Sequence, residues 1–220
     1  MTKPTARIID YYVWLMSDWA YLGGVRLVQM AARHGVLINH IPMRMQDVYA
    51  GSGGVLLAQR SWQRQAYRIA ELKRRRARLG VRLNIEPKFF PSDVDLASCM
   101  VIAAQRRGLP ASELANGVMR AVWAEDQDVS DPSVLLAIAG QAGIGGAGLL
   151  DAARTESVQA EYRGNTARAL AAGVFGSPFY LFAGELFWGQ DRLEMLEEAI
   201  ARCATGDLGR SPGVAPRASA

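Results

Sequence analysis

The sequence has few of the residues that build metal and disulfide centres. Among its 220 residues there are two cysteines and two histidines. Cys99 and Cys203 lie far apart and form no Cys-x-x-Cys motif, which excludes a dithiol redox centre. His34 and His40 do not complete the spacing of a structural zinc site with them. We therefore expect no bound metal.

Long uninterrupted apolar runs are also missing. Two windows with little charge, residues 132–150 and 169–188, reach the length of a membrane-spanning helix. The first contains five glycines and the second contains a Ser-Pro pair and Glu185, so neither predicts a transmembrane helix. No signal-peptide pattern follows Lys3 and Arg7. We therefore expect a cytoplasmic protein that does not bind a membrane.

Charge of one sign does not dominate the chain. The 25 Lys and Arg residues exceed the 21 Asp and Glu residues by four, which is too small a surplus to indicate a nucleic-acid binder. The surplus is local, because residues 60–82 hold nine basic residues and one acidic residue. The basic run at 73–78 surrounds its predicted helix, and no aromatic ladder accompanies it. We interpret this stretch as a solvated helix whose first arginines attract anionic substrates, rather than as a nucleic-acid or membrane surface.

The remaining composition, half hydrophobic and 21% charged, is that of a globular protein with a sizeable core. β-branched and aromatic runs and helical apolar spacing predict the order of the elements. The predicted strands are 7–15, 36–41, 179–183 and 185–187, and the predicted helices are 17–34, 61–79, 95–107, 111–124, 131–142, 148–172 and 192–204.

The order β-α-β, helical block, β-β-α predicts an α/β protein with a thioredoxin-like fold and a large all-helical insertion. Residues 7–42 and 174–203 then form the thioredoxin-like domain, and residues 43–173 form the insertion. Residues 204–220 are rich in Gly, Pro, Ser and Ala without an apolar period, which predicts a disordered tail.

Ser17 stands where the first predicted strand meets the first predicted helix. A serine at this position is most often a helix N-cap and nothing more. Its hydroxyl also lies at the positive end of the helix dipole, where it could stabilise a bound thiolate and lower the pKa of the thiol. The residue alone does not decide between these interpretations.

Two motifs near the C-terminus have similar alternatives. Ser177-Pro178 opens a predicted strand and is either an ordinary trans turn or a cis bond that exposes the Ser177 backbone to a peptide-like ligand. Asp191 begins the last predicted helix, and it either caps that helix or accepts a hydrogen bond from a ligand ammonium group.

Together these motifs resemble the 2-hydroxychromene-2-carboxylate isomerases, which are relatives of kappa-class glutathione transferases and of DsbA-like thioredoxin folds. The resemblance covers about residues 7–203. It is carried by Ser17-Asp18-Trp19-Ala20-Tyr21-Leu22, Gln59-Arg60, Ala66-Tyr67-Arg68, Val174-Phe175-Gly176-Ser177-Pro178 and Phe187-Trp188-Gly189-Gln190-Asp191-Arg192.

The resemblance implies a glutathione site. Ser17 matches the serine that hydrogen-bonds the glutathione sulfur and serves catalysis, and Ser177 matches the residue whose backbone pairs with the cysteinyl part. The γ-glutamyl end is matched by Gly189, Gln190 and Asp191, and the substrate pocket by Tyr49, Gln59, Arg60 and Phe90. One departure concerns the thiolate directly. Asp18 stands where the family has proline, and a carboxylate there would raise the pKa of a nearby thiol unless it points away.

The implied activity is a glutathione-dependent isomerisation of an aromatic enone carboxylate, such as 2-hydroxychromene-2-carboxylate to trans-o-hydroxybenzylidenepyruvate. Glutathione is the implied cofactor, a small aromatic carboxylate is the implied partner, and relatives of this kind are often homodimers. Arg60 is the best-matched cation for the carboxylate. Arginine suits this task because its guanidinium is bidentate and permanently charged. Two alternatives stay open: a kappa-like glutathione transferase acting on another electrophile, and a non-catalytic binding protein on a thioredoxin scaffold.

Overall fold

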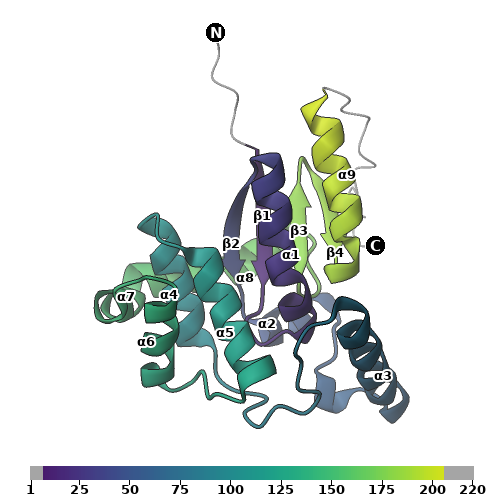
Figure 1. Cartoon of the computed structure of the whole chain (residues 1–220), viewed down its shortest axis with the longest axis horizontal. Coiled ribbons are helices and arrows are strands. Elements are labelled where there is room, and N and C mark those ends of the chain that lie inside the picture. The colour runs from purple at the N-terminus through teal and green to yellow at the C-terminus, as the bar shows by residue number, and fades with distance from the viewer. Residues whose placement is uncertain (1–6, 206–220) are drawn as a thin grey trace.

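A four-stranded mixed sheet forms the centre of the molecule. The computed structural model describes residues 7–205 (Figure 1). The strands are β1 (Ile8–Val13), β2 (Leu37–Pro42), β3 (Phe179–Phe182) and β4 (Glu185–Trp188). They lie in the order β2-β1-β3-β4, with β1 parallel to β2 and antiparallel to β3, and β3 antiparallel to β4. This is the predicted α/β arrangement, and each predicted strand is present.

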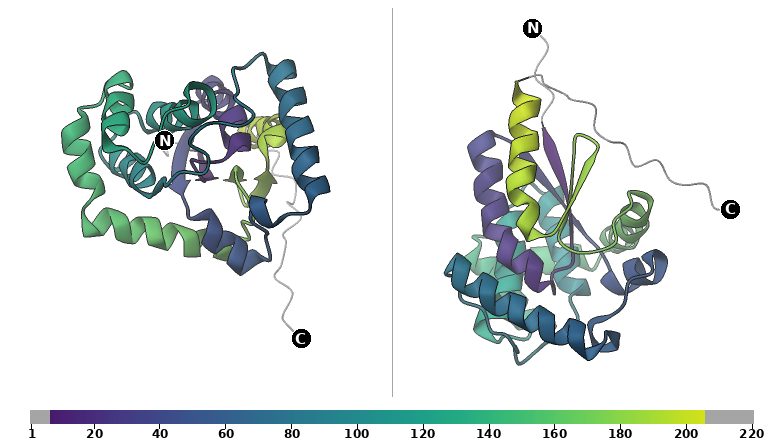
Figure 2. Two further views of the ribbon diagram at one scale, coloured as in Figure 1. Left: turned by 90° about the horizontal axis from the view of Figure 1, so that it is seen from below. Right: turned by 90° about the vertical axis from the view of Figure 1, so that its right-hand side faces the viewer.

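The helices cover both faces of the sheet and fill the segment between β2 and β3. They are α1 (Asp18–His34), α2 (Met45–Ser52), η1 (Leu57–Gln59), α3 (Trp62–Leu79), α4 (Asp95–Arg106), α5 (Ala111–Glu125), α6 (Pro132–Gln141), α7 (Gly146–Ala153), α8 (Glu156–Ala171), η2 (Gln190–Arg192) and α9 (Leu193–Ala204). Helices α1 and α9 pack on one face of the sheet, and α8 lies on the other (Figure 2). The thioredoxin-like fold with a helical insertion is thus confirmed.

The alternation of β1 places its side chains in two separate cores. Ile9, Tyr11 and Val13 pack into the large core beneath α1, α4 and α5. Tyr12 points to the opposite face and packs with residues of α2 and α8. A period of two is what a strand covered on both faces requires.

Local sequence signals explain where α1 begins and ends. The Ser17 side chain caps the first turn by accepting from the Ala20 N–H at 3.2 Å. Gly35 ends the helix in the left-handed region with φ of 58°, which glycine adopts without steric cost. The loop between β3 and β4 also needs positive φ at both central residues, Ala183 and Gly184, as a two-residue hairpin of this kind requires.

The insertion differs from the prediction in two places. The single helix predicted over 148–172 is two helices, because Thr155 adopts extended angles and its hydroxyl donates to the Ala152 carbonyl at 2.7 Å. No glycine or proline marks this break in the sequence. In addition, α2 and η1 occupy a stretch for which no helix was predicted. The tail predicted as disordered over 204–220 lies outside the described residues, except for Ala204 and Thr205.

Within residues 7–205, no helix combines the length and the apolar character that crossing a bilayer requires. Helix α3 stands apart from the others at the lower right of Figure 1. Of its 18 residues only Leu72 is buried. Leu72 packs into the large core, and Arg68 and Arg75 form ion pairs with Asp18 and Asp191 of other elements.

Candidate functional site

The hydroxyl of Ser17 lies between two chain segments that are remote in the sequence. Ser17 is 5% exposed and stands at the N-terminus of α1, where the helix dipole is positive. Its Oγ accepts from the Ala20 N–H and donates to the Ser177 carbonyl oxygen at 3.1 Å. The hydroxyl is therefore both a helix cap and a group that faces the segment before Pro178.

The Ser177–Pro178 peptide bond is cis. The Ser177 side chain accepts from the Trp14 N–H at 2.9 Å, which ties this loop to the end of β1. Pro178 in turn accepts through its carbonyl oxygen from the Gly189 N–H at 3.0 Å. The loop before β3 thus connects the start of α1 with the turn after β4.

The turn at 189–191 is held closely against α1. A Cβ atom built on Gly23 would lie 2.9 Å from the Cβ of Gln190, so glycine is what permits this approach. Gln190 is buried, and its Oε1 accepts from Arg26 at 2.9 Å. Asp191 is exposed, and its Oδ2 lies 3.8 Å from the guanidinium of Arg75.

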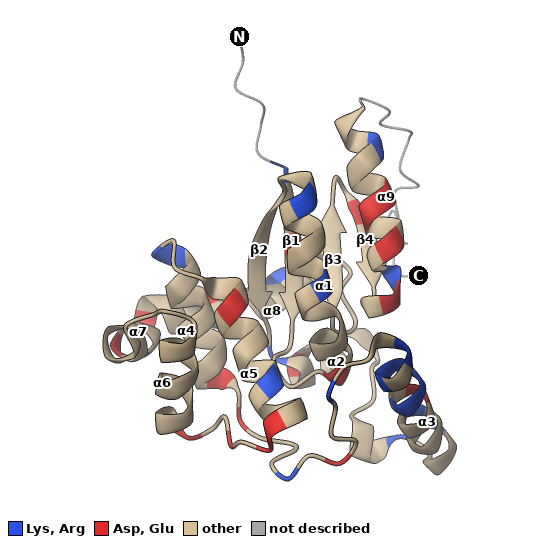
Figure 3. Cartoon of the chain, viewed as in Figure 1, with Lys and Arg blue, Asp and Glu red and all other residues tan. Residues whose placement is uncertain are grey.

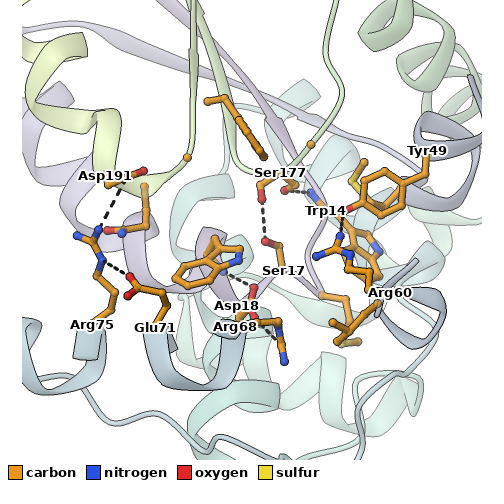
Figure 4. Close-up of a pocket in the computed structure, with 18 of the residues that line it drawn as sticks. Trp14, Ser17, Asp18, Tyr49, Arg60, Arg68, Glu71, Arg75, Ser177 and Asp191 are labelled. Atoms are coloured by element: carbon orange, nitrogen blue, oxygen red, sulfur yellow. Dashed lines mark hydrogen bonds and ion pairs between the residues drawn. The ribbon is translucent and has the colours of Figure 1, made fainter. Parts of the chain in front are cut away.

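These elements surround a cavity of about 450 Å³ (Figure 4). Of the nine residues predicted for the site, eight line it: Ser17, Tyr49, Arg60, Phe90, Ser177, Gly189, Gln190 and Asp191. The ninth, Gln59, is exposed in η1 and does not line the cavity, although its neighbour Arg60 does. In Figure 4 Ser17 lies centrally, with Asp191 toward one end and Tyr49 and Arg60 toward the other.

The end of the cavity around Arg60 is apolar apart from this guanidinium, which is hydrogen-bonded to two neighbours. Arg60 donates to the Tyr49 hydroxyl at 3.0 Å and to the Val55 carbonyl at 2.9 Å. Apolar side chains complete this end, namely Trp14, Met45, Leu56 and Leu57. A flat aromatic ligand with a carboxylate suits such a surface, because the rings pack on the apolar wall and the guanidinium binds the acid.

Asp18 has a partner that the sequence did not indicate. Its Oδ1 accepts from the Trp19 N–H at 2.7 Å, and its Oδ2 forms an ion pair with Arg68 of α3. Burial raises the pKa of Asp18, and the guanidinium of Arg68 opposes this effect by favouring the carboxylate. The carboxylate is thus directed at a helix N–H and a cation rather than at Ser17.

Arg68 is fixed by aromatic rings as well as by Asp18. Its Cζ lies 5.7 Å from the ring centroid of Phe90 and 5.8 Å from that of Trp123. Glu71, one turn farther along α3, and Arg75, two turns farther, also line the cavity, on a helix whose basic residues are blue in Figure 3. The basic stretch was interpreted from the sequence as a solvated helix whose first arginines attract anionic substrates, but Arg68 and Arg75 line the cavity and form ion pairs with protein carboxylates. The signal that could have shown this is their spacing with the buried Leu72 along one helix face.

The cysteines and metal-binding side chains give no second centre. Cys99 is buried, and burial raises its pKa to about 11. Cys203 is also a free thiol, in α9. Among residues 7–205 no three His, Cys, Asp or Glu side chains are grouped so that they could hold a metal ion.

The sheet topology and the helical insertion are those of a thioredoxin-type protein. A family model described as a DSBA-like thioredoxin domain matches residues 8–201, and the chain therefore belongs to this family. Within it, the chain is similar to a 2-hydroxychromene-2-carboxylate isomerase of Sphingobium xenophagum, with 29% identity over 202 residues that cover 91% of this chain and 99% of the relative. An isomerase of the same name from Pseudomonas putida is 27% identical over 198 residues, covering 89% of this chain and 95% of that protein.

A solved structure of a 2-hydroxychromene-2-carboxylate isomerase has the same fold. It matches with a TM-score of 0.73 and 22% identity, covering 93% of this chain and 99% of that one. The predicted DsbA-like thioredoxin fold is thus confirmed, and the resemblance to these isomerases is borne out as similarity over most of the chain.

Proposed function

We propose that the protein is a glutathione-dependent isomerase of aromatic enone carboxylates, of the type that interconverts 2-hydroxychromene-2-carboxylate and trans-o-hydroxybenzylidenepyruvate. The observation that carries the proposal is the position of the Ser17 hydroxyl, at a helix N-terminus and between two chemically different ends of one cavity. One end offers the carboxylate of Asp191, and the other offers apolar rings and Arg60.

The residues present suit a γ-glutamyl tripeptide. Ser17 and Ser177 are hydrogen-bonded to each other, so both can exchange this contact for contacts with a thiol and its peptide backbone. Asp191 could accept from the α-ammonium group, and the Gly189–Asp191 turn could hold the α-carboxylate. When bound, glutathione supplies a thiolate nucleophile whose reversible addition makes the enone double bond single and free to rotate.

The side chains of this protein ionise the thiol, bind the substrate and exclude water. The Ser17 hydroxyl and the helix dipole favour the ionised form of a thiol placed beside them. Arg60 binds the substrate carboxylate and also stabilises negative charge that develops on the substrate oxygen atoms. Trp14 and Tyr49 provide the faces on which an aromatic substrate packs, and they exclude water from it.

A kappa-like glutathione transferase is the second candidate, because Ser17 and Ser177 would serve both activities. The guanidinium of Arg60 at the apolar end favours the isomerase, since a transferase acting on a neutral electrophile has no carboxylate to bind. A non-catalytic binding protein would bind ligands at this cavity without converting one isomer into another.

The decisive experiment has two steps. Thermal-shift titration with glutathione should raise the melting temperature, and a screen of aromatic enone acids should then find one whose isomers interconvert in its presence. An isomerase leaves the glutathione concentration unchanged over many turnovers, whereas a transferase consumes one equivalent per product. Absence of glutathione binding together with absence of turnover would contradict both enzymatic functions.

A further inference from the structure

Next to Ser17 the chain places a negative charge that works against a thiolate. Asp18 is the first residue of α1, it lines the same cavity, and its side chain is 7% exposed. A carboxylate so near the start of the helix disfavours further negative charge at Ser17, and low solvent exposure leaves this repulsion poorly screened. Some other group must balance it for the site to hold an anion.

Arg68 provides that balance from a different part of the chain. Its side chain is 13% exposed, pairs with the Asp18 carboxylate and lies over the rings of Phe90 and Trp123. These contacts hold the guanidinium in one place, so its charge acts on the start of α1 at a fixed position. Arg60 also acts favourably on the Asp18 carboxylate, but it makes no ion pair with it.

The other charged groups of α3 that face the cavity are engaged elsewhere. Glu71 pairs with Arg74 and lies 3.8 Å from Arg75, and Arg75 lies 3.8 Å from Asp191. Arg68 is thus the residue of α3 whose charge is directed at the start of α1.

We propose that Arg68 is a positioning residue that neutralises Asp18 and thereby allows the N-terminus of α1 to stabilise a thiolate beside Ser17. This inference rests on the proposed function in one respect, because the proposed function places the glutathione thiolate beside Ser17. It adds that α3, which contributes one buried side chain to the core, sets the electrostatics of the reacting centre.

The test introduces a thiol at the site itself. In a Ser17→Cys protein that also carries Cys203→Ser, the pKa of the new thiol is measured from thiolate absorbance and from the pH dependence of iodoacetamide alkylation. Adding Arg68→Ala should raise this pKa by about one unit, a tenfold loss of thiolate at neutral pH. Adding Asp18→Asn alone should lower it, because Arg68 is then unbalanced. The combination of Asp18→Asn with Arg68→Ala should return it close to the parent value.

Matched variants separate charge from structure. Arg68→Lys keeps the charge and should keep the pKa near the parent value, while Arg64→Ala removes an exposed charge of the same helix and should not change it. Cys99 does not interfere, because burial raises its pKa to about 11. Circular dichroism establishes that each variant is folded, and Asp18→Asn provides a test of opposite sign should Arg68→Ala not fold.

An unchanged pKa in both Arg68→Ala and Asp18→Asn would overturn the inference, as would a combined variant that fails to restore it. The measurement uses no glutathione. Failure of the wild-type protein to bind glutathione in calorimetry would therefore contradict the proposed function and leave the role of Arg68 to be judged by the pKa values alone.

Discussion

The Ser17 hydroxyl donates a hydrogen bond of 3.1 Å to the carbonyl oxygen of Ser177. The two residues are 160 positions apart. Ser17 is the predicted contact of the glutathione sulfur, and Ser177 is the predicted backbone partner of the cysteinyl part. In the free protein they satisfy each other's polar groups, so neither is left buried without a partner. A ligand with an amide N–H and a thiolate can replace this bond with one partner for each residue.

Replacing Ser17 with alanine should affect both stability and chemistry. Loss of the cap to the Ala20 N–H should lower the free energy of unfolding by about 1 kcal/mol. The pKa of bound glutathione should rise by about one unit, and isomerisation should slow accordingly. Ser61→Ala is the matched control, because Ser61 is the N-cap of α3 and its side chain makes no cap hydrogen bond. A thiolate titration that does not differ between wild type and Ser17→Ala would contradict the assignment.

Gly23→Ala should disturb the turn that we assign to the γ-glutamyl end. The added methyl group would lie 2.9 Å from the Cβ of Gln190 and 3.2 Å from the Tyr180 hydroxyl, so the turn must move. We expect a loss of about 1–3 kcal/mol in unfolding free energy and weaker glutathione binding in calorimetry. Gly140→Ala is the control, because no atom lies within 4 Å of its added Cβ. It should leave binding unchanged and raise stability by roughly 0.5–1 kcal/mol.

Asp191→Asn should weaken glutathione binding without changing turnover at saturation. The substitution removes the charge that accepts the ammonium group but leaves the Ser17 end of the cavity intact. A tenfold increase in the dissociation constant corresponds to about 1.4 kcal/mol, a typical value for a charge-assisted hydrogen bond. Glu194→Gln, with a side chain 82% exposed, serves as the control. Equal affinities of wild type and Asp191→Asn would show that the turn does not hold the ammonium group.

Arg60→Ala should raise KM for a carboxylate substrate far more than it changes glutathione affinity. Arg60→Lys keeps the charge but loses the bidentate geometry and the contact with Tyr49, so partial activity is expected. Steady-state kinetics with an enone acid and with its neutral ester would separate the two effects. If acid and ester lose activity equally, Arg60 does not bind the carboxylate.

Burial of His40 should make stability depend on pH. Its ring packs against Tyr11, and burial lowers its pKa from 6.5 to about 4. In this pH range the unfolded chain binds a proton that the folded chain does not, so stability falls as pH falls from 6.5 toward 4. The loss reaches at most about 3 kcal/mol at the lower limit. Urea unfolding at several pH values should show that the free energy of unfolding changes less with pH in His40→Gln than in wild type. An identical dependence on pH in the two proteins would refute this account.

Short-range sequence signals predict much of the fold. The strand–helix–strand unit follows from the apolar run at 7–15, the Ser17 cap and Gly35, because each acts over a few residues. The break between α7 and α8 depends on one hydroxyl–carbonyl contact of Thr155, and helix propensity does not reveal it.

The grouping of the candidate residues around one cavity was predictable where the chain itself carries a motif. Ser17, Ser177 and Asp191 stand at the ends of strands and helices, and the thioredoxin topology brings such ends to one edge of the sheet. The pairing of Asp18 with Arg68 depends on how α3 folds back over the cavity, and no local pattern encodes that path. Gln59 shows the same limit, because the motif does not indicate which of two neighbouring side chains, Gln59 or Arg60, lines the cavity.

With one buried residue among 18, α3 can accept many substitutions at little loss of folding free energy. The same helix forms one wall of the cavity beside Ser17. Mutations that would reshape the preference for one molecule over another are thus separated from those that would unfold the chain. During evolution, such a protein can change its ligand preference by substitutions within a single helix while the rest of its fold stays constant.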